Sequence, residues 1–406
     1  MELRKIKSRF FQLLGNLDSK LLHFKKPKRI ISKNALLKIP SILKENNASN
    51  VIIISDAYLL SLSQSKKMIE ELKNNMINVT LFDGVQEKAT EKRVDQALEL
   101  YKKNRCDSII SLGGASMIDV SKILGALASD PNLTYISMQS EGKIKKRLPL
   151  FIAATTITAT GQESSYSAYL YGPITKDVYS VTSPLLLPHY VVGDTFYPLS
   201  ASKDILAYSC MDVLSYSLEA YVSLSKNKKG RVLAEESISL ILENFEKFYQ
   251  DQNDENLASS LLLASYKRGL SSSYLGEGYI SSISHILGAM CNKPHGYIAS
   301  LICPYVLELY GSSINRKLSI LAKKYHFTPD SAPESVQAHV IIEKIKDMNQ
   351  SMGIPQYLEG VIKRKDIPLI VDQILDNSSS LFLTPRVFSK KELIKLLKRV
   401  CVDKVV

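Results

Sequence analysis

The sequence predicts an α/β protein in which a doubly wound parallel sheet is followed by an all-helical domain. Two observations lead to this prediction. From residue 30 to about residue 199, short runs typical of buried strands alternate with helical segments, and beyond residue 199 the apolar residues recur with helical spacing. Such alternation indicates a parallel sheet with helices on both faces, whose ligands bind at the carboxyl ends of its strands. We expect domains at residues 27–199 and 200–406, preceded by a basic amphipathic extension at residues 1–26.

The N-terminal extension combines four basic side chains within its first nine residues with a stripe of Ile, Phe and Leu. A helix of this kind can lie on an anionic membrane surface, although such a stripe more often docks on its own protein or on a neighbouring subunit. We favour docking for residues 1–24 and expect a homodimer. The chain has no evident secretory cleavage site and no apolar run long enough to span a bilayer, so we expect a cytoplasmic protein.

The composition is that of an ordinary globular chain, with 406 residues of which 45% are hydrophobic. Its five cysteines are scattered and lack metal-ligand spacing, which indicates reduced thiols rather than disulfides or a zinc knuckle. The formal charge of +12 would suit a nucleic acid, an anionic membrane or an anionic substrate. Since the basic residues are spread along the chain without a nucleic-acid-binding signature, we expect a solvated basic surface and no nucleic-acid partner.

Three strands are predicted in the α/β region, at residues 50–55, 79–82 and 107–112. The first is followed by Asp56, where a carboxylate can accept hydrogen bonds from an adenosine ribose and would repel a ribose phosphate. A carboxylate at a strand end is also a common helix cap, so both roles stay open for this residue.

The third strand runs into a Gly-Gly turn, Gly113-Gly114, which a predicted helix follows. Two glycines allow the backbone to approach a phosphate, and the helix would direct its free N–H groups and the positive end of its dipole at the anion. Ser116 and Asp119 have capping-box spacing. With a strand before it and a helix after it, the turn predicts a dinucleotide site, although Gly-Gly after a strand is only a turn in many proteins.

A threonine-rich segment at residues 148–161 comes next and includes Thr155, Thr156 and Thr160. Small hydroxyl side chains and the closing Gly161 suit a backbone that approaches a cofactor. A β-branched core strand that ends in a polar turn would explain the threonines nearly as well.

Polar residues interrupt two apolar helical stretches of the second domain. The helix predicted over residues 204–224 would carry a carboxylate, a phenol and a second carboxylate on one face, at Asp212, Tyr216 and Glu219. The second stretch has Ser281 and His285 at helical spacing, and His295 in a Pro-His-Gly turn. We expect the two clusters to lie together. Alternatively, Asp212 bonds locally and both His residues are satisfied core polar groups.

Together these motifs resemble the iron-containing (group III) alcohol dehydrogenase family over residues 27–400. The Gly-Gly turn resembles the family's GGGSxxDxxK cofactor motif, with Ala115 in place of the third Gly, and residues 148–163 resemble its PTTAGTGSE segment. The resemblance implies the dehydroquinate synthase-like architecture of this family, and NAD in preference to NADP because Asp56 matches an Asp that favours NAD. The implied cofactor contacts are Asp56, Gly113, Gly114, Ser116, Asp119, Thr155, Thr156 and Thr160.

The resemblance also covers the family's two metal-site segments, GMDALTHAIEAY and HxxxHPLGAxxxxPHG. Asp212 and His295 match two of the four metal ligands, whereas Tyr216 and Ser281 occupy the other two positions. His285 matches a His that is not a ligand and lies near the nicotinamide and the substrate. Because neutral phenol and hydroxyl groups are poor ligands for iron or zinc, the metal site is expected to be weakened or absent, unless His285 is recruited as a third ligand.

The resemblance therefore implies an NAD-dependent oxidoreductase that interconverts an alcohol and an aldehyde or ketone. In that reading Tyr216, with His285, is the general acid in place of the metal. The charge of the chain makes an anionic or phosphorylated carbonyl compound worth testing. Two alternatives remain: a non-catalytic relative that binds a nucleotide for regulation or assembly, and a membrane-surface protein that uses residues 1–24.

Overall fold

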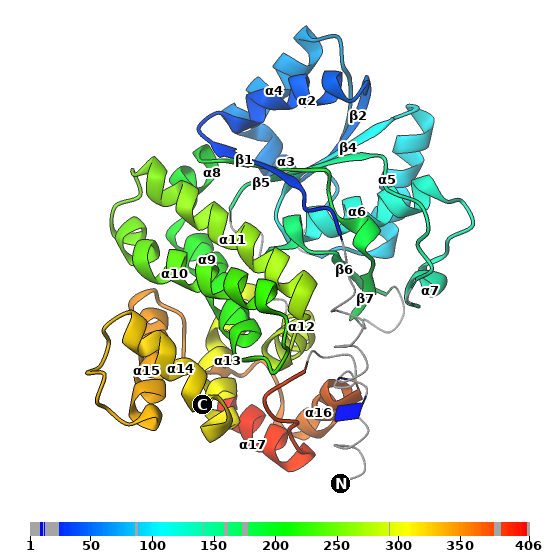
Figure 1. The fold of residues 1–406 in the computed structure, drawn as a ribbon. Coiled ribbons are helices and arrows are strands. Elements are labelled where there is room, and N and C mark those ends of the chain that lie inside the picture. The colour runs from blue at the N-terminus through cyan, green and yellow to red at the C-terminus, as the bar shows by residue number, and fades with distance from the viewer. Residues whose placement is uncertain are drawn as a thin grey trace. The chain divides into compact units, whose positions relative to one another are not determined.

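The computed structural model describes residues 9–10, 12, 24–85, 88–140, 142–157, 161–172, 178–291, 293–376 and 383–403. These residues form two compact units (Figure 1). The α/β unit comprises Phe24–Ser202 and Leu240–Ser273. The helical unit comprises Lys203–Ser239 and Tyr274–Val406, with the described residues of Met1–His23. The chain thus passes between units at Ser202–Lys203, near the expected boundary, and a later helical stretch returns to the α/β unit.

A six-stranded sheet forms the centre of the α/β unit, and its strand order is β1-β8-β5-β4-β2-β3. Every neighbouring pair in it is parallel. The strands are β1 (Lys28–Ser32), β2 (Asn50–Ile54), β3 (Asn78–Phe82), β4 (Ser108–Gly113), β5 (Leu150–Thr155) and β8 (Tyr190–Asp194). The predicted doubly wound parallel sheet is therefore confirmed, and the carboxyl ends of β2, β4 and β5 are neighbours.

Both faces of the sheet are covered, which explains why β2 reads as an unbroken apolar run. Ile52 and Ile54 belong to one apolar cluster, whereas Val51 and Ile53 belong to the other. The first cluster includes residues of α5 (Glu91–Lys103) and α6 (Ala115–Ser129). The second includes residues of η1 (Ala35–Lys38), α2 (Ile39–Glu45) and α4 (Ser63–Asn74). Three short helices complete this part: α3 (Ala57–Ser61), α7 (Tyr135–Met138) and α8 (Phe196–Ser200).

An antiparallel hairpin of β6 (Ser167–Tyr171) and β7 (Val178–Thr182) lies outside the main sheet, and the sequence analysis did not predict it. Only alternate residues of β6 are buried, so the pattern of buried apolar residues that would predict this strand is short and incomplete.

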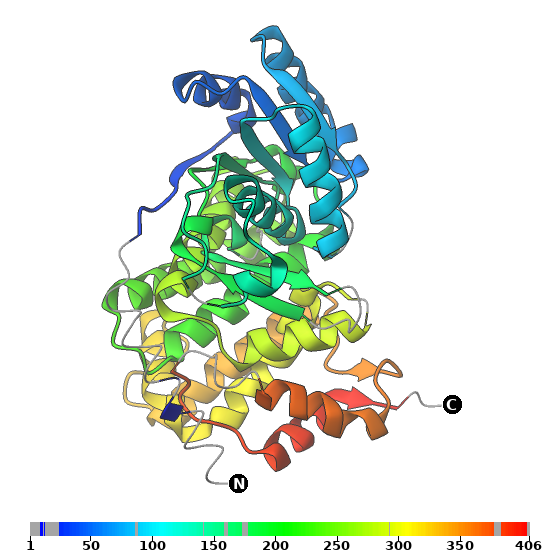
Figure 2. The same cartoon turned by 90° about the vertical axis from the view of Figure 1, so that its right-hand side faces the viewer.

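The helices after residue 199 agree with the predicted helical spacing. Beyond α8 they are α9 (Lys203–Val222), α10 (Lys228–Gln250), α11 (Glu255–Leu275), α12 (Tyr279–Cys291), α13 (His295–Tyr310), α14 (Asn315–Lys324), α15 (Glu334–Ser351), α16 (Ile367–Asp376) and α17 (Lys390–Val400). Helix α13 packs against both α9 and α12. Because α9 is apolar or small-residue-rich on every side, it is buried from Cys210 to Val222. Figure 2 shows the two-stranded parallel pair β9 (Leu358–Glu359) and β10 (Cys401–Val402) beside α17.

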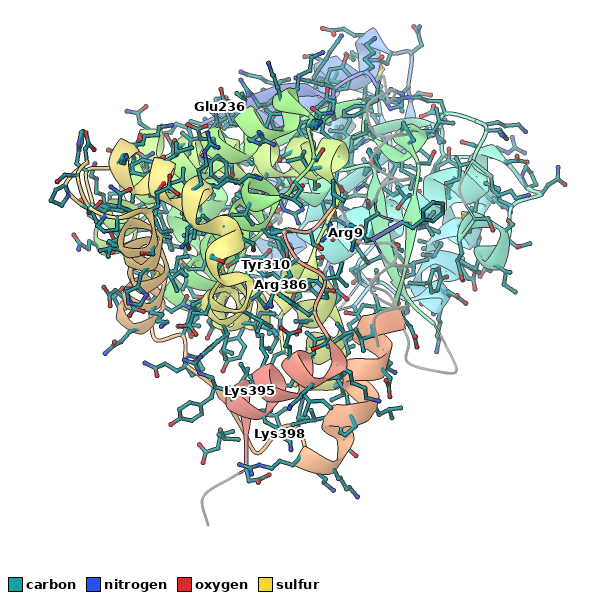
Figure 3. The ribbon with its side chains drawn as sticks, turned by 60° about the horizontal axis from the view of Figure 1, so that its bottom comes forward. Arg9, Glu236, Tyr310, Arg386, Lys395 and Lys398 are labelled. Carbon is teal, nitrogen blue, oxygen red and sulfur yellow. The ribbon has the colours of Figure 1, made fainter. Side chains whose placement is uncertain are left out.

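The N-terminal extension is described only at Arg9, Phe10, Gln12 and Phe24. The Arg9 guanidinium donates to the backbone carbonyl of Thr384 at 2.7 Å, a contact within the helical unit (Figure 3). On α17, the basic side chains of Lys395 and Lys398 are exposed (Figure 3).

All five cysteines are free thiols, as expected, and four of them are buried. Among the described residues, one helical stretch within His295–Lys324 is long and apolar enough to cross a membrane. Of its most apolar segment, 61% is buried inside the protein, and the core helix of a globular protein has the same property.

Candidate functional site

The Gly-Gly turn at the end of β4 has the geometry of an anion cradle. Gly113 has a φ of 148°, and a Cβ at this residue would lie 3.0 Å from the Met117 side chain. A Cβ at Gly114, by contrast, would meet no atom within 4 Å, so open space adjoins this residue. Gly114, the N-cap of α6, has no side chain with which to cap the helix, and a helix start of this kind is a common anion-binding feature. These features fit the pyrophosphate of a dinucleotide.

The expected capping box between Ser116 and Asp119 is wrong, because Gly114 rather than Ser116 is the N-cap of α6. The Asp119 carboxylate is 4% exposed and accepts a hydrogen bond of 2.7 Å from the side-chain amide of Gln162. Asp119 thus links α6 to the loop that contains Gln162. Direct contacts of Ser116 and Asp119 with a cofactor stay predictions.

Asp56 is a helix cap, one of the two roles left open by the sequence. Its Oδ1 atom accepts a hydrogen bond of 2.7 Å from the backbone N–H of Leu59 at the start of α3. A carboxylate has further acceptor capacity on its second oxygen, so the cap is compatible with a ribose contact, which stays a prediction.

The threonine-rich segment lies beside the cradle, because Thr155 of β5 pairs with Gly113 of β4. Thr155 and Thr156 are buried, and the Thr155 hydroxyl donates to the backbone carbonyl of Ile157 at 2.6 Å. Thr160 lies outside the described residues.

Lys122 is a buried cation whose role the sequence analysis missed. Its ammonium is inaccessible to solvent and donates to the backbone carbonyls of Gln162, Ser165 and Ser167 at 2.8, 2.9 and 2.6 Å. The signal in the sequence was a lysine among apolar residues of the helix that follows the Gly-Gly turn. Burial also raises the pKa of the nearby Glu163 carboxyl, and the Lys122 charge is among the influences that oppose this shift.

Two glycines bring the same loop against α11. Gly161 has a φ of 82°, and a Cβ on it would lie 2.5 Å from the backbone nitrogen of Gly269. A Cβ on Gly269 would lie only 1.9 Å from the Gly161 carbonyl oxygen. The loop is thus fixed on one side by α6 and on the other by α11, all within the α/β unit.

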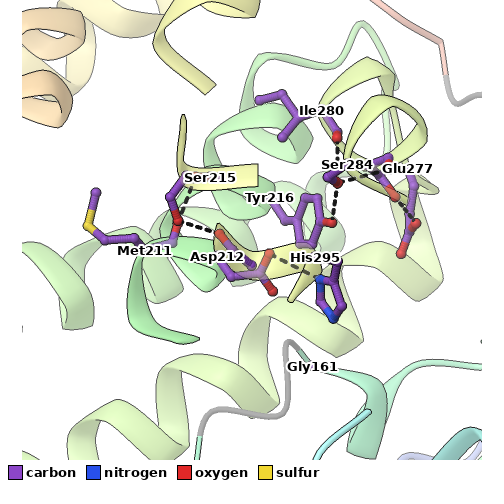
Figure 4. Close-up of polar contacts among 12 residues, drawn as sticks. Gly161, Met211, Asp212, Ser215, Tyr216, Glu277, Ile280, Ser284 and His295 are labelled. Atoms are coloured by element: carbon purple, nitrogen blue, oxygen red, sulfur yellow. Dashed lines mark hydrogen bonds and ion pairs between the residues drawn. The ribbon is translucent and has the colours of Figure 1, made fainter. Parts of the chain in front are cut away.

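In the helical unit, the polar residues of α9 meet those of α12 and α13, as the sequence predicted (Figure 4). His295 Nδ1 lies 3.5 Å from Asp212 Oδ1. The Tyr216 ring stacks on the His295 ring with centroids 6.4 Å apart, and the His285 and His295 centroids are 5.4 Å apart. Gly296 allows this approach, because a Cβ there would lie 2.7 Å from the backbone oxygen of Tyr208 on α9.

The hydroxyls of Tyr216 and Ser281, at the positions where the family resemblance implies metal ligands, are engaged within the protein. Tyr216 Oη lies 2.8 Å from Ser284 Oγ, and Ser281 Oγ donates to a carboxylate oxygen of Glu277. Neither hydroxyl is thus directed at Asp212, whose carboxylate is inaccessible to solvent.

The remaining donor set does not fit the iron or zinc that the family resemblance implies. Both oxygens of Asp212 lack a hydrogen-bond partner among the described residues, and His295 supplies one nitrogen beside them. In the part of the chain that the structure describes, no three His, Cys, Asp or Glu side chains gather in a way that could hold a metal ion. Recruitment of His285 as a third ligand therefore has no support. Two protein ligands are too few for a tight divalent site.

Ser284 was missed by the sequence analysis, although it precedes His285 and lies three residues after Ser281. Its hydroxyl lies 2.7 Å from the Ile280 carbonyl as well as 2.8 Å from Tyr216 Oη. A serine has one hydroxyl hydrogen, so when Ser284 donates to Ile280, Tyr216 donates to Ser284. When Tyr216 donates elsewhere, Ser284 can turn and donate to Tyr216. Either hydroxyl of the pair can therefore donate the hydrogen bond to the other, depending on where the Tyr216 hydrogen is directed.

Glu219, the second carboxylate of the predicted polar face, caps α12. Its oxygens accept hydrogen bonds from the backbone N–H groups of Gly278, Ile280 and Ser281 at 3.1, 2.5 and 3.3 Å. Burial raises the pKa of the Glu219 carboxyl to about 8. This residue therefore anchors the start of the helix that carries Ser284 and His285.

Two sequence profiles match the chain in succession. Residues 27–195 match iron-containing alcohol dehydrogenase, and residues 206–401 match the C-terminal part of the Fe-containing alcohol dehydrogenase family. The NAD-dependent methanol dehydrogenase of Bacillus methanolicus is 23% identical and covers 92% of this chain and 97% of its own. The 1,3-propanediol dehydrogenase of Citrobacter freundii is 24% identical and covers 90% of this chain and 95% of its own.

Solved structures share the fold. A 1,3-propanediol oxidoreductase superposes with a TM-score of 0.87 at 21% identity, over 93% of this chain and all of its own. An alcohol dehydrogenase from Oenococcus oeni superposes with a TM-score of 0.87 at 22% identity, over 93% of this chain and 99% of its own.

Proposed function

Because the chain belongs to the iron-containing alcohol dehydrogenase family, we propose that it is an NAD-dependent oxidoreductase in which Tyr216 takes the place of the metal. Its reaction interconverts an alcohol and an aldehyde or ketone. Two relatives, at 23% and 24% identity, are named as dehydrogenases, and this supports the interconversion of an alcohol and a carbonyl compound. The formal charge of +12 supports an anionic carbonyl substrate.

The cradle at Gly113 and Gly114 supports NAD as the cofactor. Open space adjoins Gly114 at the start of α6, where the positive end of the helix dipole would favour a pyrophosphate. Asp56 favours NAD over NADP, because its carboxylate would repel a 2′-phosphate. Bound at this site, NAD would supply the hydride acceptor for alcohol oxidation, and NADH would supply the hydride donor for carbonyl reduction.

The proposal that Tyr216 is the general acid rests on the contact between the Tyr216 and Ser284 hydroxyls. During carbonyl reduction, the Tyr216 O–H donates its proton to the carbonyl oxygen as negative charge develops there. Ser284, 2.8 Å away, then turns its hydrogen from the Ile280 carbonyl to the Tyr216 oxygen and stabilises the phenolate. Tyr216 regains its proton from water, and alcohol oxidation follows the reverse course. His285, which is only partly buried, is the second candidate donor beside this pair.

Substitution of Tyr216 by Phe tests the proposed acid. We expect the rate constant for NADH-dependent carbonyl reduction to fall by about 100-fold or more, since general acid catalysis typically contributes that much. Tyr221→Phe is the matched control, because Tyr221 is a buried tyrosine on the same helix. A Tyr216→Phe enzyme as active as this control would exclude Tyr216 as the acid.

The non-catalytic alternative predicts a different result. Such a protein would bind NADH but reduce none of a panel of aldehydes, ketones and sugar phosphates. A double substitution, Tyr216→His with Ser281→His, would then gain metal and activity together, because it restores four donors. We further propose that the protein is a cytoplasmic homodimer, which ultracentrifugation and fractionation can test.

A further inference from the structure

Gln162 connects the loop after β5 to the helix that begins at the cradle. The residue is 3% exposed and starts η2 (Gln162–Ser164). Its side-chain amide donates to Asp119 Oδ1 at 2.7 Å, and its side-chain oxygen accepts from the Ser165 hydroxyl at 2.6 Å. Its backbone carbonyl accepts from Lys122 at 2.8 Å. Both the amide nitrogen and the side-chain oxygen of Gln162 thus make hydrogen bonds, and two of its partners, Asp119 and Lys122, lie on α6.

The two partners on α6 lie close to the start of that helix. Asp119 and Lys122 have i, i+3 spacing, so they lie on one face of the N-terminal half of α6. A displacement of Gln162 would therefore change how the loop lies against the cradle. The family segment that residues 148–163 resemble has Ser at this position, so the link through a longer amide belongs to this chain.

The strand order shows which half of a dinucleotide the loop would meet. Strands β2, β4 and β5 are consecutive in the sheet, and they are followed by Asp56, the cradle and the Gln162 loop in the same order. With the adenosine ribose at Asp56 and the pyrophosphate at the cradle, the nicotinamide nucleoside extends towards the end of β5.

We propose that Gln162 is a positioning residue for the nicotinamide half of NAD(H), which rests on the NAD binding proposed above. Its bonds to Asp119 and Ser165 hold the loop where this half of the cofactor binds. The bare diphosphate nucleotide ADP, which lacks the nicotinamide half, does not need the loop in this position.

Gln162→Glu tests this role because it replaces the donor to Asp119 by a second carboxylate at the same buried place. Like charges at hydrogen-bond distance repel strongly in a buried site. We expect the Kd of NADH to rise about tenfold or more in Gln162→Glu, and the Kd of ADP to change by less than about twofold, as measured by calorimetry. Adding Asp119→Asn should restore the NADH Kd to within about threefold, since the amide that this change introduces can donate to the new carboxylate and Ser165 still donates to its other oxygen.

Gln64→Glu is the matched control. Gln64 is also 3% exposed, and its amide donates at 2.9 Å to the buried carboxylate of Asp194 in the same unit. This variant should lose thermal stability to a similar extent as Gln162→Glu, yet keep the ratio of the NADH and ADP dissociation constants unchanged. Thermal unfolding of all variants establishes that binding is measured on folded protein.

The outcomes separate the inference from the function it rests on. If the unaltered protein binds neither NADH nor ADP, the proposed NAD function fails and the inference fails with it. If the unaltered protein binds NADH but Gln162→Glu binds it equally well, only the inference is overturned. The same holds if Gln162→Glu weakens ADP and NADH alike, or if Asp119→Asn does not rescue it, because a general loss of structure would then explain the effect.

Discussion

At the scale of single residues, burial decides what the charged groups of this protein do. Lys122 and Glu219 are both inaccessible to solvent, and each is surrounded by backbone partners of the complementary kind. Lys122 holds three carbonyls of a loop, whereas Glu219 holds three N–H groups at the start of α12. Both therefore act on backbone position rather than on substrate.

Glu219 makes the stability of the protein depend on pH. Burial raises the pKa of its carboxyl from an ordinary 4.5 to about 8, so the folded state holds the proton more tightly than the unfolded chain. Its stabilising contribution is complete below the unfolded pKa and is lost as pH rises through the folded pKa. We expect the free energy of unfolding to fall by roughly a few kcal/mol between those limits, and Glu219→Gln to flatten this dependence.

Denaturant unfolding at a series of pH values measures the effect. Glu236→Gln is the control, because Glu236 is exposed and its removal should leave the pH dependence as it is in the unaltered protein. An unchanged pH profile in Glu219→Gln would contradict the role assigned to burial of this carboxyl.

At the scale of elements, the junction of β4 and α6 predicts a separation of stability from binding. A Cβ at Gly114 would touch nothing within 4 Å, and its φ of −89° suits any residue. Gly114→Ala should therefore cost no more than about 1 kcal/mol, the usual cost of Ala at an N-cap. The new methyl group would occupy the space assigned to the pyrophosphate, so we expect the Kd of both NADH and ADP to rise about tenfold.

Calorimetry and thermal unfolding of Gly114→Ala check this expectation together. Unchanged affinity for both nucleotides would remove the cradle from the cofactor site. The expected loss of ADP binding also distinguishes this variant from Gln162→Glu, in which ADP binding should persist.

The sequence predicted correctly those strands and helices whose apolar residues recur with a clear spacing. The apolar run of β2 and the helical spacing of α9 were both read from it, and both agree with the structure. The β6–β7 hairpin was missed because its short strands are only half-buried. The supposed Ser116–Asp119 capping box was wrong because the helix begins at Gly114, and helix starts are decided by local backbone geometry.

Candidate site residues were predictable where a motif carried them and not where a distant partner did. Asp212, Tyr216 and His295 stood out because polar groups interrupt apolar helices, and they meet as expected. Ser284 and Gln162 look like ordinary polar residues in the sequence. Their importance comes from Tyr216, 68 residues from Ser284, and from Asp119, 43 residues from Gln162, and such pairings are set only by the fold.

At the scale of the whole molecule, the chain has the family fold, and its polar cluster differs from the metal-site pattern that the family resemblance implies. The cradle of the α/β unit retains the features that suit a dinucleotide. The polar cluster of the helical unit contains Asp212 and His295, whereas the hydroxyls of Tyr216 and Ser281 are engaged with Ser284 and Glu277. A cradle that suits a dinucleotide, together with a donor set that does not suit a metal, is what the proposed cofactor chemistry with a different acid requires.

Metal analysis combined with activity tests this central claim most directly. Protein purified without chelator should contain far less than one equivalent of iron or zinc, because Asp212 and His295 leave most of the coordination to water. NADH-dependent carbonyl reduction should persist after dialysis against a chelator and should be lost in Tyr216→Phe. Stoichiometric, tightly held metal in the unaltered protein, or activity that a chelator abolishes and iron or zinc restores, would contradict the replacement of the metal by Tyr216.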